Sequence, residues 1–425
     1  MKVKNLLYII LTSSAMSVLR HLDPEKDREA VLRIWKEIGW LEKGKEDIFD
    51  ILLEADGGNY VAELHGTPEC NVTTVAGKIR YMENELPLSV VASVLTSTVA
   101  RRQGLAAKLT AKAIAESAVD GACLSGLGIF DQGFYNQLGY GTGSYENWIF
   151  FDPASLIVDK QVKTPKRITK EDWKKVHRSR LNRTKHHGMV DLSNETDTRL
   201  EMIWPTHSFG LGYYDDDDEL THHIFFRADN LHDSKYNVQW MAYQNKEQFM
   251  ELMSILKSLS DQIHMIIMRE PPGIQFQDIL KRPFRHRRIT KESKYENKMM
   301  SSAYWQMRIL DIDSCVEAFS HTGHQLRFNL SLTDTIDKLL EKNASWKGLS
   351  GDYTITLGAK SSVNHVKKRG LPTLKTTINA FTRMWLGVRP ASDLFMTDEL
   401  EAPPALLKEL DEVLRLPTPH PDWDF

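Results

Sequence analysis

The residues from Arg101 to Ala106 have the types and spacing of a phosphate-binding turn. They read Arg101-Arg102-Gln103-Gly104-Leu105-Ala106 and stand between an apolar stretch and a run with helical periodicity. Glycine lets a backbone approach a ligand closely, and the first turn of a helix leaves amide groups free beside the positive end of its dipole. Such amides bind phosphate oxygens, and the arginines add positive charge beside them. Taken alone, this spacing is more typical of a tight turn with solvated arginines.

Two groups elsewhere in the chain could transfer protons. Tyr135 follows Gly104 by 31 residues, and a tyrosine hydroxyl can protonate a thiolate product that lies beside it. Considered on its own, Tyr135 is better interpreted as a core aromatic beside Phe134 and Tyr140. The α-carboxylate of Phe425 can accept a proton and attract a cation. A frayed terminus is the common alternative, but an end with two aromatic residues indicates anchoring.

An alternation of helices and strands must position these groups. Apolar residues at helical spacing predict a helix over 27–40 and another that starts at Leu105. Four strands are predicted, over 59–63, 73–81, 86–95 and 121–129. The strand before the turn is mostly apolar, which indicates a central place in a sheet. The phosphate-binding turn therefore joins a strand to a helix in a domain that mixes the two.

The rest of the chain carries fewer chemical signals. No second Arg-x-x-Gly-x-Ala occurs between 167 and 300, where the periodicity predicts helices over 172–180 and 247–259 and strands over 237–243 and 262–268. A further domain begins near Tyr304, and late prolines enforce an extended tail after a helix over 406–414. The acidic run 215–219 is interpreted as a solvated loop, with an amine-attracting rim as the alternative. The paired histidines at 186–187 and 222–223 lack the spacing of metal ligands, so we predict no metal site.

Composition excludes several classes of protein. The chain has 425 residues, which suits two to four domains at one per roughly 100–200 residues. Its 54 basic and 57 acidic residues leave a nearly neutral charge, which argues against a protein that coats nucleic acid or an anionic membrane. Cys70, Cys123 and Cys315 lie far apart and form no metal-ligand pair or disulfide framework. No segment after the N-terminus approaches the roughly 18 consecutive apolar residues that a membrane span needs.

The segment from Met1 to Ala15 resembles a short secretory signal. Two lysines precede an apolar run over 6–11, and small residues follow. The run is short for a signal core, so we favour a start at Met16 or an extension of the chain over export. We accordingly expect a cytoplasmic protein, with export through this segment as the alternative.

Together these motifs resemble the Eis family (enhanced intracellular survival proteins) of the GNAT acetyltransferases. The residues that carry the resemblance are the turn from Arg101 to Ala106, the segment Phe134 to Gly141, and the acidic residue and Phe425 at the end. The resemblance extends from Met16 to Phe425. It implies an α/β (α+β) protein with tandem GNAT-fold domains and a sterol carrier protein-like C-terminal domain. The implied division is an N-terminal extension over 1–15, a catalytic GNAT domain over 16–160, a second GNAT-like domain without the cofactor loop over 161–303, and the sterol carrier protein-like domain over 304–425, which delivers the C-terminus to the active site.

The resemblance also implies an N-acetyltransferase with acetyl-CoA as its co-substrate and no metal. In the GNAT pattern, the backbone of Val94 and Thr96 would bind the pantetheine arm of CoA. The pyrophosphate would be bound by Arg101, Arg102, Gln103, Gly104, Leu105 and Ala106. The Eis-family pattern makes Tyr135 the acid for the CoA thiolate and the Phe425 carboxylate the base for the amine. The acetyl group would pass by direct attack to a primary amine of aminoglycoside, polyamine or lysine type. The alternative is a non-catalytic acyl-CoA or lipid-binding protein on the same fold.

The resemblance bears on partners and on acceptor choice as well. It implies a small-molecule or peptide amine as partner and a homo-oligomer, with a hexamer as the family's state, and we expect neither nucleic acid nor membrane as a partner. Two positions depart from the family pattern. Phe130 stands where the best-known relatives have a small polar residue, and Gly128 stands where some have a histidine. Since these positions line the acceptor pocket in the family, the identity of the amine stays open.

Overall fold

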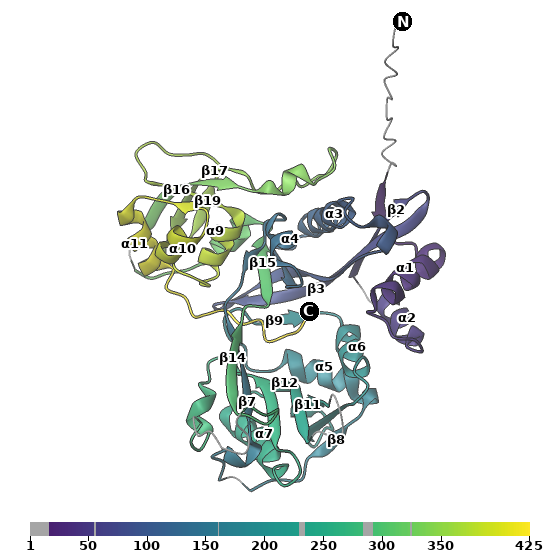
Figure 1. The fold of residues 1–425 in the computed structure, drawn as a ribbon. Helices are drawn as coiled ribbons and strands as arrows, with labels where there is room; N and C mark the ends of the chain where they lie inside the picture. Colours follow the sequence, from purple (N-terminus) through teal and green to yellow (C-terminus); the bar gives the residue numbers. More distant parts are fainter. Residues whose placement is uncertain (1–16, 55–56, 160, 229–233, 284–291, 324) are drawn as a thin grey trace, which may run out of the picture.

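The computed structural model describes residues 17–54, 57–159, 161–228, 234–283, 292–323 and 325–425. The signal-like segment Met1 to Ala15 lies outside these residues, as does most of the run 282–288, which reads Arg-Pro-Phe-Arg-His-Arg-Arg and forms a basic patch in the sequence. Within them the chain forms three sheets with helices packed against each (Figure 1). None of the described helices is both long enough and apolar enough to cross a membrane.

The first sheet holds the turn from Arg101 to Ala106. An antiparallel meander leads into a parallel pair whose connection is helix α3 (Leu105–Val119). In spatial order its strands are β1 (Val18–His21), β2 (Gly57–Leu64), β3 (Thr67–Tyr81), β4 (Asn84–Thr96), β5 (Leu124–Gly128), β15 (Trp305–Ile309) and β6 (Gly141–Thr142), and β9 (Val190–Leu192) pairs with β3. The strands predicted from the sequence within β2, β3, β4 and β5 are confirmed. β4 is buried over most of its length, with four successive buried residues from Leu88 to Val91, as expected for a central strand covered on both faces.

The second sheet repeats this topology. A meander again leads into a parallel pair, and helix α7 (Lys246–Ser258) is the crossover between its strands. In spatial order the strands are β14 (Lys298–Ser302), β7 (Glu146–Phe151), β13 (Met265–Arg269), β12 (Lys235–Ala242), β11 (Leu220–Arg227), β10 (Ser208–Tyr214) and β8 (Lys166–Ile168). Two units of one topology therefore stand in tandem, although only the first has the turn with Gly104 before its crossover helix.

The two units exchange strands. β7 follows the first unit in sequence but pairs with β13 and β14 of the second. β15 follows the second unit but pairs with β5 of the first. The sheets therefore do not coincide with continuous stretches of sequence, and the ranges 16–160, 161–303 and 304–425 stay a proposal for the division of the chain.

The third sheet packs against the first through a shared core. Its strands, in spatial order, are β18 (Ser362–Asn364), β17 (Gly351–Leu357), β16 (Leu326–Thr333), β19 (Thr373–Thr377) and β20 (Leu400–Glu401). Trp305 and Met307 of β15 belong to the same apolar cluster as Phe328 of β16. At this junction Arg308 lies 2.6 Å from Asp334, and neither side chain is exposed. A buried ion pair that loses one partner leaves an uncompensated charge, so the junction is held in one geometry.

The helices begin and end where local signals place them. Asp23 caps α1, Pro24 opens it, and Gly39 with φ 80° ends it. The described α-helices are α1 (Pro24–Ile38), α2 (Glu46–Glu54), α3, α4 (Gln132–Asn136), α5 (Trp173–Leu181), α6 (Glu195–Ile203), α7, α8 (Ile312–Glu317), α9 (Ile378–Trp385), α10 (Ala391–Thr397) and α11 (Pro404–Val413). Short 3₁₀ turns occupy Thr98–Ala100, Pro153–Ser155, Lys170–Asp172, Phe276–Ile279 and Thr335–Lys338. The helices predicted over 27–40, 172–180, 247–259 and 406–414 are confirmed.

Candidate active site

The site begins where β4 and β5 part. The two strands pair in parallel from Leu88 with Leu124 to Val91 with Leu127, and their pairing ends there. Beyond Val91 the register of β4 against β3 shifts by one residue, which marks a β-bulge. A bulge bends its strand, so the segment with Val94 and Thr96 continues beside β3 and leaves β5. The backbone of both residues on the β5 side is thereby open to a ligand.

The turn from Arg101 to Ala106, predicted to bind phosphate, follows at the same end of the sheet. Arg102 with φ 60° and Gly104 with φ 74° are left-handed, and Gly104 is the N-cap of α3. A Cβ added at Gly104 would meet nothing within 4 Å, so the turn is open on that side. Among the described residues the amides of Leu105, Ala106 and Ala107 have no acceptor, as expected for a first helical turn. These amides and the exposed side chains of Arg101 and Arg102 suit an anionic ligand.

Tyr135 lies on α4, just after β5. Asp131 caps this helix by accepting a hydrogen bond of 3.2 Å from the amide of Phe134. The Tyr135 ring is buried between Phe134 and Tyr140, with ring centroids 4.9 and 6.2 Å away. Burial, together with the charge of Asp131, raises the pKa of Tyr135 to about 12. The hydroxyl therefore keeps its proton at neutral pH and can donate it to a stronger base.

The C-terminus of the chain meets the end of β5. A Cβ added at Gly128 would lie 2.5 Å from the terminal oxygen of Phe425. Gly128 is the last residue of β5 and lies just beyond the point where β4 leaves that strand. The terminal carboxylate thus reaches the first sheet beside the open backbone of β4. The predicted anchoring of the terminus is confirmed, and Figure 1 shows the C-terminus between the units, beside β9.

Gly128 offers a direct test of this contact. We expect Gly128→Ala to displace the carboxylate and to lower kcat about 100-fold, since a shift near 1 Å can cost that much. Gly126→Ala is the matched control, because a Cβ there, on the same face of β5, meets only ordinary contacts of 3.6–3.7 Å. Steady-state kinetics with both variants checks this. Equal kcat for the two variants would show that the carboxylate has no part in turnover.

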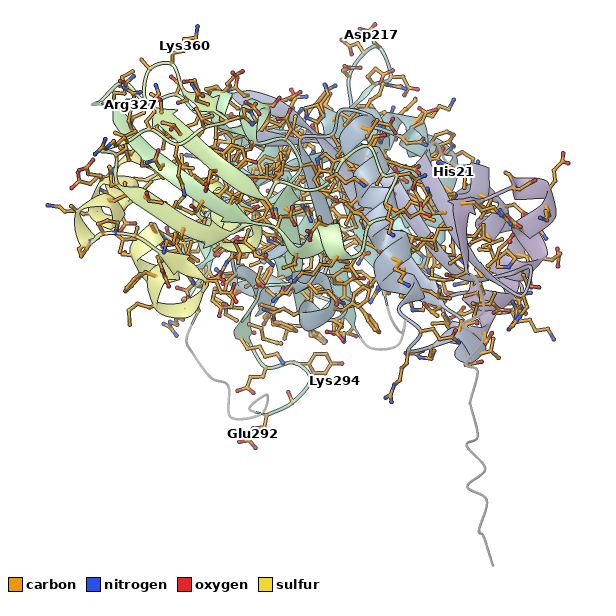
Figure 2. All side chains as sticks on the ribbon, turned by 90° about the horizontal axis from the view of Figure 1, so that it is seen from above. His21, Asp217, Glu292, Lys294, Arg327 and Lys360 are labelled. Carbon is orange, nitrogen blue, oxygen red and sulfur yellow. The ribbon has the colours of Figure 1, made fainter. Side chains whose placement is uncertain are left out.

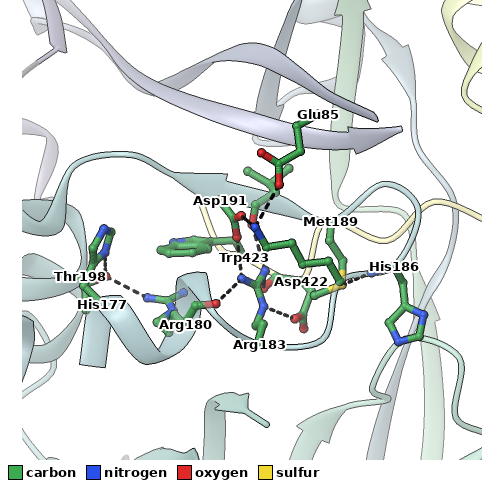
Figure 3. A network of polar contacts seen from close by, with 12 residues as sticks. Glu85, His177, Arg180, Arg183, His186, Met189, Asp191, Thr198, Asp422 and Trp423 are labelled. Carbon is green, nitrogen blue, oxygen red and sulfur yellow. Dashed lines mark hydrogen bonds and ion pairs between the residues drawn. The ribbon is translucent and has the colours of Figure 1, made fainter. Parts of the chain in front are cut away.

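An ionic clamp holds the tail in place (Figure 3). The buried guanidinium of Arg183 donates to Asp422 at 3.0 Å and to Asp191 at 2.7 Å, so it joins the tail to β9. Nearer the terminus, Arg269 lies 2.7 Å from Asp424. The amide of Val190 donates to the carbonyl of Pro421 at 2.8 Å, which extends the attachment to the backbone. Charged groups that pair on both sides of a segment restrict its path.

Trp423 is the apolar anchor of the same tail. Its ring is 1% exposed and lies under the guanidinium of Arg180 at 3.6 Å from the ring centroid. Its indole N–H donates to Glu201 at 3.0 Å, and Glu201 also pairs with Arg180. A desolvated cation over a tryptophan face is among the stronger contacts of this kind. Side chains from the second unit therefore set where the last three residues lie.

Other charged motifs from the sequence lie elsewhere. Figure 2 shows Asp217 on a turn that projects from the body of the molecule. Asp218 of this turn pairs with Lys175 of α5, and Glu219 pairs with Arg178 of the same helix. The acidic run is therefore an exposed hairpin turn between β10 and β11, two of whose five acidic residues are paired, which fits the solvated loop better than the amine-attracting rim.

The paired histidines are engaged in hydrogen bonds. His187 Nδ1 accepts from the amide of Met82 at 3.1 Å and its Nε2 lies 2.9 Å from the carbonyl of Leu386. His222 Nε2 lies 2.9 Å from Glu251. In the part of the chain that is described, no group of three or more histidine, cysteine or acidic residues could hold a metal ion.

Sequence reasoning missed most of the residues that direct the tail. Arg183 and Arg269 carry no local motif, because the tail residues that they hold lie at the far end of the chain. Gly128 did give a signal, since it departs from the pattern of the family that the sequence resembles. The steric reason for a glycine there became clear only with Phe425 against it.

Several solved structures resemble the whole chain. A protein from Enterococcus faecalis described as a probable N-acyltransferase has 17% identity and a TM-score of 0.78, over 96% of this chain and 100% of its own. A GCN5-related N-acetyltransferase from Anabaena variabilis has 14% identity and a TM-score of 0.77, with the same coverage. Eis1 from Mycobacterium abscessus has 14% identity and a TM-score of 0.72, again over 96% and 100%.

These likenesses establish the fold. They cover nearly the whole chain, and the predicted α/β class with GNAT-type units is confirmed. No family model matches the sequence, and no curated protein matches it significantly. None of the comparisons identifies the region 304–425 as a sterol carrier protein-like domain.

Proposed function

We propose that this protein is an N-acetyltransferase that transfers an acetyl group from acetyl-CoA to a primary amine. The observation that carries the proposal is the Phe425 carboxylate against Gly128, at the point where β4 parts from β5. The open turn at Gly104 and the protonated Tyr135 belong to the same unit. The proposal thus assigns an anion-binding turn, an acid and a base to one end of one sheet.

The chain's own residues suit acetyl-CoA. The free amides after Gly104, with Arg101 and Arg102 beside them, would hold the pyrophosphate, and Gln103, Leu105 and Ala106 complete that loop. The open backbone of Val94 and Thr96 would bind the amides of the pantetheine arm and polarise the acetyl carbonyl. In this arrangement the acetyl thioester lies between the parted strands.

Proton transfer would accompany direct attack. The amine nitrogen forms a bond to the acetyl carbon, and the bond from that carbon to sulfur breaks. The Phe425 carboxylate accepts the proton that the amine loses, directly or through water. The Tyr135 hydroxyl gives its proton to the departing thiolate, and the products are an amide and CoA. An α-carboxylate is negatively charged at neutral pH, so it also attracts the cationic form of the acceptor.

An acetylation assay tests the proposal. The full-length protein is incubated with acetyl-CoA and a panel of primary amines, including aminoglycosides, polyamines and lysine peptides, and CoA release is followed with a thiol reagent. We expect CoA release that depends on the amine, together with calorimetric binding of acetyl-CoA. Binding of CoA or lipid without turnover on any amine would instead support the alternative, a non-catalytic acyl-CoA or lipid-binding protein.

We also propose the family of this protein, its oligomeric state and its location in the cell. The sequence motifs and the likeness to Eis1 from Mycobacterium abscessus support membership of the Eis family, with a sterol carrier protein-like unit over 304–425. The same resemblance supports a homo-oligomer, with a hexamer as the expected state. Acetyl-CoA is a cytosolic metabolite, so a cytoplasmic location is favoured over export.

A further inference from the structure

We propose that the acceptor carries a single positive charge on an aromatic or other apolar body. This inference rests on the proposed function and narrows its acceptor, since polycationic amines fit the site poorly. Two features carry it: a cavity beside the C-terminal tail, and a row of aromatic rings that leads from the end of β5 to that cavity.

The cavity lies directly before the terminal residue. It has a volume of about 230 Å³, and Trp423 and Asp424 of the tail line it together with Trp204 and Trp240 of the second unit. Sites for drug-sized ligands usually measure roughly 300–1,000 Å³. This cavity therefore suits one ring with a short chain better than several linked sugar rings.

The charges around the cavity are balanced. Three carboxylates and three arginines line it, namely Glu201, Asp422, Asp424, Arg180, Arg227 and Arg269. Each of these carboxylates pairs with an arginine. Glu201 pairs with Arg180 and Asp424 pairs with Arg269, while Asp422 pairs with Arg183, which does not line the cavity. Paired carboxylates offer little net attraction to additional cations. A polyamine or aminoglycoside would gain little here, whereas a single ammonium group needs only the terminal carboxylate.

A row of aromatic rings in successive contact, here called the aromatic wall, runs from the end of β5 to the cavity, with exposed rings at the β5 end and a buried ring behind them. We define it as Phe130, Trp40, Trp35 and Trp204, whose successive ring centroids lie 6.4, 5.8 and 6.1 Å apart. Phe130 comes two residues after Gly128 and is 83% exposed. Trp35 is buried, with its indole N–H donating to Asn71 at 3.2 Å, and so holds the two tryptophans beside it. Trp204 at the other end lines the cavity.

This wall favours an aromatic body for two reasons. Phe130 and Trp40 are exposed at one end of this row, and exposed rings that lie together remain costly in water until an apolar group covers them. Aromatic ligands also pack against tryptophan in favourable stacked or edge-on geometries. A hydrophilic amine would lose hydration at the same surface and find few partners for its polar groups. Phe130, which replaces a small polar residue of the family pattern, belongs to this surface.

The first experiment compares acceptors on the full-length protein with acetyl-CoA. Tryptamine, spermidine and kanamycin are assayed at equal pH, at low and at physiological salt. We expect kcat/KM for tryptamine to exceed that for spermidine and kanamycin by at least about tenfold, with little dependence on salt. A higher kcat/KM for spermidine or kanamycin would overturn this inference and leave the proposed function intact. No CoA release with any amine would overturn the proposed function itself.

The second experiment changes the wall. Trp204→Ala should lower kcat/KM for tryptamine at least about tenfold, mainly through KM, and leave ethylamine, which has no ring, unaffected. Trp204→Phe should recover most of the loss. Phe209→Ala is the matched control, since Phe209 is a partly buried aromatic residue of the same unit that packs in a cluster with no residue of the cavity or the wall. If Trp204→Ala reduced activity on tryptamine and ethylamine equally, the inference would be wrong.

Discussion

Deletion of Phe425 is expected to lower kcat by about 10²- to 10⁴-fold, the usual range for a lost general base. The shortened chain ends in a carboxylate at Asp424, but that residue is held by Arg269 and lies one position short of Gly128. The anion-binding turn at Gly104 is untouched, so the affinity for acetyl-CoA should not change. Stopped assays for kcat and calorimetry for binding separate the two effects.

Two controls make this deletion informative. Phe425→Leu keeps the terminal carboxylate in place and should retain most of the activity. A chain extended by one C-terminal glycine should lose activity as the deletion does, because its carboxylate moves away from Gly128. Combining the deletion with Gly128→Ala should add little further loss, as is usual for groups that act as a unit. Full activity after the deletion would exclude the carboxylate as the base.

Tyr135→Phe is expected to lower kcat by about 10²-fold or more, through loss of the acid for the thiolate. Phenylalanine keeps the buried ring against Phe134 and Tyr140. In the part of the chain that is described, the Tyr135 hydroxyl has no hydrogen-bond partner that the change would leave unpaired. The fold and acetyl-CoA binding should therefore persist, and thermal unfolding and calorimetry check this.

Tyr140→Phe is the matched control. The Tyr140 hydroxyl lies 2.7 Å from that of Ser125 in the buried core, so its loss should destabilise the fold by about 1–3 kcal/mol. It should leave kcat nearly unchanged. The opposite outcome, a stable Tyr140 variant with low kcat beside an active Tyr135→Phe, would assign the acid to Tyr140.

The raised pKa of Tyr135 also predicts a pH profile. An acid works only below its pKa, which burial has raised to about 12. The kcat of the wild-type protein should therefore show no falling limb up to about pH 10, because the hydroxyl still holds its proton there. A profile of kcat from pH 6 to 10 checks this expectation. A falling limb near pH 8 would point to a different acid.

The turn and the elements beside it could be predicted from the sequence. The apolar run 86–95 and the helix expected from Leu105 correspond to β4 and to α3, which begins at Leu105. These elements depend on local properties: a mostly apolar run in a buried strand, and a left-handed glycine at a helix start. The roles of Val94, Thr96 and the loop residues toward acetyl-CoA remain predictions.

The exchange of strands could not be predicted. β7 and β15 are short strands whose composition does not say which sheet they complete. Their partners, β13 and β5, lie far from them in sequence. Pairing over such distances is decided by packing of the whole chain, whereas strand propensity reports only a fit to a half-buried surface.

The C-terminal tail shows most clearly which features follow from local sequence and which depend on contacts with distant residues. Its late prolines and terminal aromatic residues indicate an extended, anchored end, since proline limits the backbone and buried rings hold a segment in place. Its destination depends on Arg183, Arg269 and the missing side chain at Gly128. Local conformation follows from adjacent residues, so the sequence by itself determined the turn, the helix and the extended tail. The meeting of Phe425 with β5 needs charges and space from three distant segments, and only the tertiary structure brings these together.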